Sequence, residues 1–214
     1  TARSRGLGDV YKRQIKDMAG LLRPRTCYEL VKKLKKNLNI PIHLHTHSTT
    51  GLSDATNFKA YEAGIDNIDT SISSFSNLYA HTATESFISM MYSEEKNPFD
   101  MELLTKISVY FNEVRKKYKK YEGSMRGVDV NMLTNQVPGG MLSILEKQLL
   151  DLNKADKFKL LIDEIPKIRK DVGYVPLVTP SSQIVGAQAL MNVLDEQRYK
   201  TCLLYTSPSP RDLA

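Results

Sequence analysis

The chain has 214 residues, of which 41% are hydrophobic and 25% charged, a composition typical of a globular protein. No apolar run approaches the roughly 20 residues that cross a bilayer, and no signal peptide is visible, so direct membrane insertion is not expected. The formal net charge is +6, but the lysines are interspersed with acidic residues and lack interleaved aromatic residues, which argues against a nucleic-acid partner.

The two ends of the chain do not resemble the rest. Residues 8–14 (GDVYKRQ) and residues 202–207 (CLLYTS) can be encoded by DNA strings that are reverse complements over most of their length. These strings resemble the transposon end used to prepare sequencing libraries, read in opposite directions. Ordinary tails are the alternative, but complementarity of this length rarely arises by chance. We therefore expect residues 1–14 and 202–214 to be foreign tails.

The native segment then runs from about Ile15 to Lys200. Cys27 is its one cysteine, because Cys202 falls in a tail. A single cysteine forms no internal disulfide, which is typical of proteins from a reducing compartment. A cytoplasmic location is therefore expected.

Strands and helices are predicted to alternate in the first half of the chain. Pro24 suits the first position of a helix, and Cys27, Val31 and Leu34 mark the apolar face of that helix. The next expected elements are strands at residues 40–45 and 65–72 and helices at residues 53–63 and 84–92. Alternation with short links is typical of βαβ units, so a parallel sheet is predicted.

The pattern becomes helical after Pro98. A long helix is predicted over residues 100–121, where apolar residues recur at helical spacing. The further helices are expected at residues 141–150, 154–172 and 182–194. The sequence therefore predicts an α/β portion over residues 15–98 and an α-helical portion over residues 99–201.

Three histidines alternate along one predicted strand. His43, His45 and His47 share a face of that strand, and the last two lie nearest its C-terminal end. Parallel α/β folds carry their active sites at that end, and two imidazoles at this spacing can bind one divalent metal. Buried histidines bonded to their neighbours are the alternative. The polar, glycine-ended turn at residues 48–51 favours a site.

Lys16 lies at the end of the preceding predicted strand, in IKDMAG (residues 15–20). A lone lysine is usually a solvated surface charge, and an ammonium group has no lone pair for a metal. A buried, deprotonated lysine could instead react with carbon dioxide and form a carbamate, which is an anionic oxygen ligand. The residues alone leave both interpretations open.

Two more motifs stand in the helical portion. QVPGGM (residues 136–141) is a glycine turn before a helix. In LVTPSSQIVGAQAL (residues 177–190), the following proline holds Thr179 extended, and Ser181 or Ser182 can cap the helix. A turn and a capped helix start are the simpler interpretations of these motifs when each is taken alone.

Together the motifs resemble the carboxyltransferase domain shared by oxaloacetate decarboxylase α subunits, pyruvate carboxylases and the pyruvate-specific subunit of transcarboxylase. The matching stretches follow the family's order: IKDMAG, HLHTHSTTG, AYEAGIDNIDTSIS, ATES, QVPGGM and LVTPSSQIVGAQAL. The resemblance implies an α/β fold, namely the C-terminal part of a (β/α)8 TIM barrel, about its last three strands, followed by an α-helical funnel domain.

The resemblance also implies a metal site. A divalent metal (Zn, Mn or Co) would be bound by His45, His47 and a carbamylated Lys16, with an aspartate from an earlier barrel strand that this sequence lacks. Biotin would be carried on a separate domain or subunit. The parent protein would then be a homo-oligomer or part of a multisubunit complex.

Residues of the second portion complete the implied site. Thr179 matches the family's proton-relaying threonine, and Ser182 and Gln183 match positions that line the biotin pocket. Many pyruvate carboxylases have lysine in place of Gln183. The glutamine, together with HSTTG after the histidines, is more like the decarboxylase and transcarboxylase branches.

The implied function is transfer of a carboxyl group between oxaloacetate or pyruvate and biotin through a metal-stabilised enolpyruvate. The expected parent is an oxaloacetate decarboxylase α subunit or transcarboxylase, with a pyruvate carboxylase subunit as the alternative. A lyase or synthase on a related HxH barrel, or a non-catalytic binding module, fits the motifs less well. Because the first barrel strands have no match, the chain is expected to be a fragment that is inactive by itself.

Overall fold

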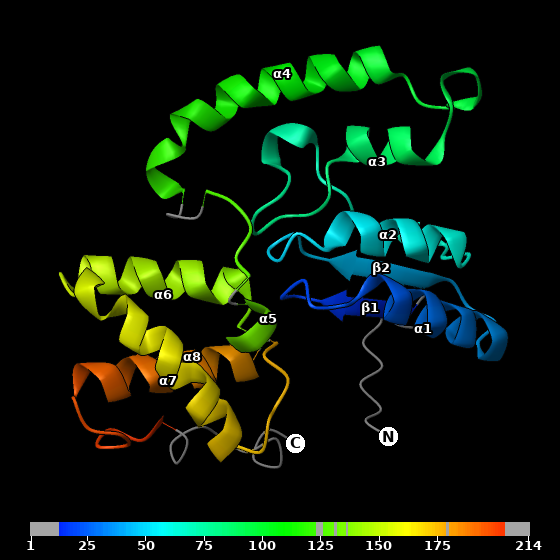
Figure 1. Cartoon of the computed structure of the whole chain (residues 1–214). Helices are drawn as coiled ribbons and strands as arrows, with labels where there is room; N and C mark the ends of the chain where they lie inside the picture. Colours follow the sequence, from blue (N-terminus) through cyan, green and yellow to red (C-terminus); the bar gives the residue numbers. More distant parts are fainter. Residues whose placement is uncertain (1–12, 123–125, 131, 136, 179, 204–214) are drawn as a thin grey trace. The chain divides into compact units, whose positions relative to one another are not determined.

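The computed structural model describes residues 13–122, 126–130, 132–135, 137–178 and 180–203. The chain forms two compact units, Thr1–Leu133 and Thr134–Ala214, each of which is described by itself. Figure 1 shows the helices and strands along the chain. None of the described helices combines the length and the apolar character needed to cross a membrane.

The first unit contains a small parallel sheet with flanking helices. Its described elements are β1 (Arg13–Asp17), α1 (Pro24–Asn37), β2 (Ile42–Thr46), α2 (Ser53–Glu62), β3 (Asn67–Ile68), η2 (Ser73–Phe75), α3 (Thr84–Met91), η3 (Glu94–Lys96), α4 (Met101–Lys117) and η4 (Lys119–Tyr121). The alternation of strands and helices confirms the predicted α/β class and the parallel sheet.

The sheet has the order β1-β2-β3, and its register fixes which side chains share a level. Lys16 of β1 pairs with His45 of β2, and Asp17 pairs with Thr46. Register partners in parallel strands point to the same face of the sheet. Lys16 and His45 therefore belong to one face, and Asp17 and Thr46 belong to the other.

The core of the first unit lies on one face of β2. Leu44 is fully buried with Cys27 and Val31 of α1 and with Ala60 of α2. Burial raises the pKa of the Cys27 thiol to about 11, so the residue packs as a small apolar side chain. Because side chains alternate along a strand, the histidines next to Leu44 point to the opposite face.

The predicted strand at residues 65–72 is wrong in its length, since β3 comprises only Asn67–Ile68. Soon after β3 the chain no longer pairs with β2. Ser71 forms an isolated bridge with Ala83, and the Ser71 amide donates to the carbonyl of Thr82. This exchange of partners turns residues 71–82 into a loop at the C-terminal end of β2. The loop carries one side of the candidate site.

The second unit is helical, as predicted. Its elements are α6 (Gly139–Asp151), η5 (Ala155–Lys157), α7 (Phe158–Asp171) and α8 (Ser181–Leu194), while the short α5 (Met132–Asn135) spans the division between the units. The buried apolar side chains of these helices include Leu145, Leu149, Leu161, Ile165, Ile168, Val185 and Ala189. Their helical spacing is what the sequence pattern showed.

The expected domain boundaries at residues 14, 98 and 201 stay predictions. The described strand β1 begins at Arg13, two residues before the expected native start at Ile15. At the other end, the amide of Leu203 donates to Gln188 Oε1 at 2.7 Å. The compact units divide at Leu133, which groups α4 with the sheet.

Candidate metal centre

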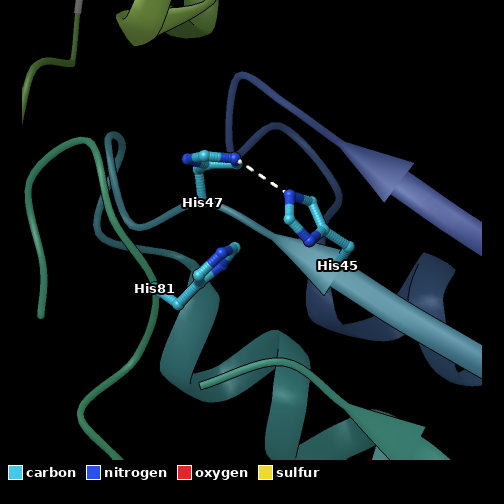
Figure 2. A group of neighbouring side chains, drawn as sticks. All are labelled: His45, His47 and His81. Atoms are coloured by element: carbon cyan, nitrogen blue, oxygen red, sulfur yellow. Dashed lines mark hydrogen bonds between the residues drawn. The ribbon is translucent and has the colours of Figure 1, made fainter. Parts of the chain in front are cut away.

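Three imidazoles meet at the C-terminal end of β2. His45 lies in the strand, His47 follows it, and His81 comes from the loop over residues 71–82. Their candidate ligand atoms all lie within 4.8 Å of one another, and the Nε2 atoms of His45 and His47 are 3.2 Å apart. Figure 2 shows the three side chains gathered around one space. The spacing suits ligands of a single ion.

Each of the three rings is held through its Nδ1 atom. His45 Nδ1 donates to Asp69 Oδ2 at 2.6 Å, His81 Nδ1 donates to the carbonyl of Thr46 at 2.8 Å, and His47 Nδ1 donates to the carbonyl of Tyr79. A carbonyl oxygen only accepts, so the proton must reside on Nδ1. Partners of this kind orient metal-binding histidines and fix their tautomer.

This tautomer gives the cluster its chemistry. A neutral ring with its proton on Nδ1 has a lone pair on Nε2. The Nε2 atoms of His45 and His47 face each other at 3.2 Å, so in the neutral state two lone pairs converge. They can share a proton only if one ring becomes cationic. A divalent cation between them would satisfy both lone pairs at once.

The electrostatic environment keeps His47 neutral. Burial lowers the pKa of His47, and the neighbouring His81 and His45 lower it further, against the opposite effect of the Tyr79 carbonyl. The pKa of Asp69 is lowered as well, but for a carboxyl group a lower pKa favours the charged form. Burial raises the pKa of Asp69, but hydrogen bonds from His45 and His43 outweigh that effect and hold the pKa below its usual value. Its carboxylate is therefore ionised and can orient His45.

A tight turn after β1 holds the backbone of His47. The His47 amide donates to the Asp17 carbonyl at 3.1 Å. The Asp17 carboxylate accepts from the amides of Leu21 and Leu22 at 2.8 and 2.9 Å and from Thr46 Oγ1 at 2.7 Å. Gly20 completes the turn with φ of +67° and lies against the carbonyl of His47. IKDMAG thus positions the histidine strand through its aspartate and glycine.

Helix α4 holds the loop that carries His81. Arg115 Nη1 donates to the carbonyl of Ser74 at 2.7 Å, and Ser73 Oγ lies 2.6 Å from Ser108 Oγ. The rings of Phe75 and Phe111 pack edge to face with centroids 5.7 Å apart. These contacts fix the loop near its start, before it reaches Tyr79 and His81.

The other sequence-predicted residues are placed differently. Lys16 is exposed on the sheet face that carries His45, and it makes no hydrogen bond or ion pair within the described part of the chain. Ser182 is half-buried and Gln183 exposed, both in the first turn of α8. Thr179 lies outside the described residues. Ser182 and Gln183 belong to the second unit.

The expected cap of α8 is not formed. The N-cap residue is Pro180, whose side chain makes no capping hydrogen bond. Ser181 is already helical, and its hydroxyl donates backwards to the carbonyl of Val178 at 2.8 Å. A proline at the cap position leaves no side-chain acceptor for the first-turn amides.

His81 was missed by sequence reasoning. It lies in a loop, where neither helical nor alternating periodicity exists, and long-range bonds bring it to the cluster. The Ser48 amide also donates to the carbonyl of Ala80 at 2.8 Å, which draws the loop to the end of β2. The one available signal was composition: the chain has four histidines, and three of them were already candidates.

Two family models match successive parts of the chain. The HMGL-like model matches residues 8–111, and the conserved carboxylase domain matches residues 132–204. Together they cover both the sheet with its histidines and the helical unit.

Curated relatives and solved structures agree with these matches. A pyruvate carboxylase subunit of Methanocaldococcus jannaschii is 48% identical over 87% of this chain and 33% of that protein. The methylmalonyl-CoA carboxyltransferase 5S subunit of Propionibacterium freudenreichii is 44% identical over 84% of this chain and 36% of that protein. The carboxyl transferase domain of Rhizobium etli pyruvate carboxylase, solved with pyruvate and biocytin, has 31% identity and a TM-score of 0.81, covering 86% of this chain and 31% of that one.

The chain thus spans about a third of the length of these relatives. They correct one expectation, because they support the pyruvate carboxylase alternative better than the favoured likeness to an oxaloacetate decarboxylase α subunit. Both the sheet and the helical unit have counterparts in the same proteins. The chain belongs to the family of biotin-dependent carboxyltransferase domains found in pyruvate carboxylases and transcarboxylase.

Proposed function

We propose that this chain forms part of a carboxyltransferase site that transfers a carboxyl group between biotin and pyruvate, in one of the subunits of a pyruvate carboxylase. The observation that carries the proposal is the convergence of imidazoles at the C-terminal end of a parallel strand, in a chain of this family. The relatives named as pyruvate carboxylases support pyruvate as the acceptor. Biotin would arrive on a carrier domain of the same complex.

The proposed fold of the parent is a TIM barrel with a helical domain after it. Its three-stranded parallel sheet would supply late strands of the barrel, with the cluster at the carboxyl ends where barrel enzymes act. The likeness to a third of the Rhizobium etli domain supports this assignment.

Three residues are proposed to hold the metal: His45, His47 and a carbamate on Lys16. The fit rests on the donor set, since two imidazoles already face each other and the register places Lys16 on the same sheet face. When bound, a divalent metal would supply a Lewis acid that polarises the keto oxygen of pyruvate. The carbamate requires a deprotonated amine, which burial favours, and Lys16 is exposed in this chain.

The second unit is proposed to handle the proton and the biotin. Thr179 would move a proton between the ureido nitrogen of biotin and the methyl carbon of pyruvate, because a hydroxyl both donates and accepts. Ser182 and Gln183 would line the biotin pocket, and their accessible positions in the first turn of α8 are compatible with that role. A pocket that excludes water would protect carboxybiotin from hydrolysis.

Replacing Thr179 should abolish carboxyl transfer without removing the metal. The test uses a chimera in which residues 13–203 replace the matching third of the Methanocaldococcus jannaschii protein. Thr179→Ala should lower biotin-dependent release of pyruvate from oxaloacetate by about 10²–10⁴-fold, the usual loss for a positioned proton donor or acceptor. Thr179→Ser should keep partial activity, because the hydroxyl remains.

The matched control is Thr105→Ala, which removes an exposed threonine hydroxyl of α4 and should leave the rate unchanged. Wild-type turnover by the Thr179→Ala chimera would end the relay role. A folded, metal-loaded wild-type chimera without biotin-dependent activity would overturn the proposed function itself.

A further inference from the structure

We infer that His81 is a ligand of the metal, together with His45 and His47. The inference rests on the proposed function, since it adds a third imidazole to that site. The family resemblance assigns no role to His81, and the assignment comes from geometry alone. The three histidines form a cluster whose ligand atoms lie within 4.8 Å of one another.

The ring of His81 presents its second nitrogen to the cluster. Its Nδ1 atom donates to the carbonyl of Thr46 at 2.8 Å, which leaves the lone pair on Nε2. The ring centroid of His81 lies 4.5 Å from that of His45 and 4.7 Å from that of His47, so the His81 ring is about equally close to both. In Figure 2 the His81 ring points toward the space between the other two.

The distances between the ring nitrogens are close to those of a metal site, so only a small movement of His81 is needed to bind an ion. Two nitrogens bound to one zinc at about 2.0–2.1 Å lie roughly 3–3.5 Å apart in tetrahedral geometry. The His45 and His47 nitrogens already satisfy this at 3.2 Å. The limit of 4.8 Å for the whole cluster requires a shift of about 1–2 Å for His81, which rotation of its side chain can supply.

His43 is the natural comparison for His81. It lies on the same face of β2, but its Nε2 atom donates to Asp69 Oδ1 at 2.6 Å, and it is not a member of the cluster. This arrangement is typical of a structural histidine: the ring makes a hydrogen bond, but its nitrogens do not converge with those of the other imidazoles. His81 has both a bond that orients it and a lone pair that faces two other imidazoles.

The test counts the coordinated imidazoles. The chain contains four histidines, all in this region, so the 214-residue chain without a purification tag gives an unambiguous count. After loading with Co²⁺, proton NMR in water detects the Nδ1–H of each coordinated imidazole as a strongly shifted line that disappears in deuterium oxide. Three such lines are expected, because each Nδ1–H is held by an acceptor and exchanges slowly.

Two variants separate coordination from structural support. His81→Asn keeps an N–H near the position of Nδ1 for the Thr46 carbonyl and removes Nε2, so two shifted lines should remain. Binding of Co²⁺ should weaken by at least about tenfold, the smaller end of the loss caused by removing only a partner of a metal ligand. His43→Gln keeps a donor for Asp69 and should retain three lines.

The outcomes distinguish this inference from the function it rests on. Two shifted lines in the wild-type chain, unchanged in His81→Asn, would overturn the role of His81 and leave a two-histidine site. No shifted line would overturn the metal site and the proposed function together. In the chimera defined above, the line lost in His81→Asn, rather than the total number of lines, identifies the ligand, and this result does not depend on the stability of the shorter chain.

Discussion

Gly20→Ala should destabilise the first unit by roughly 2–5 kcal/mol, combining left-handed backbone strain with overpacking. Gly20 has φ of +67°, a conformation that residues with a Cβ atom rarely adopt. A Cβ at this position would also come closer than 3.0 Å to the carbonyl oxygen of His47, a backbone atom that cannot rotate away. The turn and the histidine strand would have to separate.

The chain offers a matched control for Gly20→Ala. Gly64 has φ of +87°, but a Cβ there would meet no described atom within 4 Å. Gly64→Ala should therefore cost only the backbone strain, about 1–2 kcal/mol. Urea unfolding of the chimera measures both losses, and the difference between them reports the contact with His47.

Hydrogen exchange locates the damage. In the Gly20→Ala variant, exchange should accelerate at the amides of Leu21, Leu22 and His47, all of which bond to Asp17. The Gly20→Ala variant should also bind Co²⁺ more weakly, because the substitution displaces His47. Equal losses of stability for the two glycine variants would show that the His47 carbonyl yields freely and that the turn does not position the histidine.

Glu164→Ala should have a comparable effect on the second unit. The Glu164 side chain is 8% exposed, and it accepts from Arg198 Nε at 2.6 Å and from Asn192 Nδ2 at 2.9 Å. Breaking a buried pair costs roughly 3–5 kcal/mol because the remaining partner is left unpaired. Arg198 is about half exposed and also bonds Asp171, so we expect about 2–4 kcal/mol.

The stability contributed by Glu164 should depend on pH. Burial raises its pKa, but hydrogen bonds from Arg198, Asn192 and Lys167 lower the pKa more, so the folded value lies below the ordinary 4.5. A carboxylate with a depressed folded pKa stabilises the protein above the unfolded pKa, and that contribution is lost as the pH falls through the folded pKa. The loss therefore begins below pH 4.5.

Urea unfolding of Glu164→Ala at neutral pH tests the first expectation, and unfolding of Glu164→Gln at a series of pH values tests the second. The difference in unfolding free energy between wild type and Glu164→Gln should be largest above pH 4.5 and should shrink in more acidic solution. Asp151→Asn is the control, since Asp151 pairs with Lys147 on the surface of α6 and should change stability by less than about 0.5 kcal/mol. A difference that is constant with pH would mean that folding does not lower the pKa of Glu164.

Local patterns predicted the parts of the fold that local forces determine. Helical periodicity identified α1 and α7 because each buries one apolar stripe. It also identified α4, although Leu103 and Ile107 of its predicted apolar face are exposed. Alternation identified the face shared by His45 and His47, which depends only on strand geometry. The strand over residues 65–72 was predicted too long because only its first part bonds to β2, through the amides of Asp66 and Asp69. Ser71 bonds instead to Thr82 and Thr84, a choice of partner that its own residues do not encode.

The candidate site shows the same division. His45 and His47 could be paired from spacing, whereas His81 depends on a loop closing over the end of β2. The positioning roles of Asp17 and Gly20 were also hidden, because the partners of Asp17 include Thr46, 29 residues away. Lys16 was expected to need burial for carbamate chemistry, and its exposure in this chain leaves that role a proposal.

The anchors of the cluster differ in how much sequence change they tolerate. His47 is oriented by the backbone carbonyl of residue 79, an acceptor that every amino acid provides. His45 is oriented by the carboxylate of Asp69, a group that only the side chain supplies. Sequence change at residue 79 therefore leaves the acceptor of His47 in place, whereas position 69 is constrained by the two imidazoles of His43 and His45.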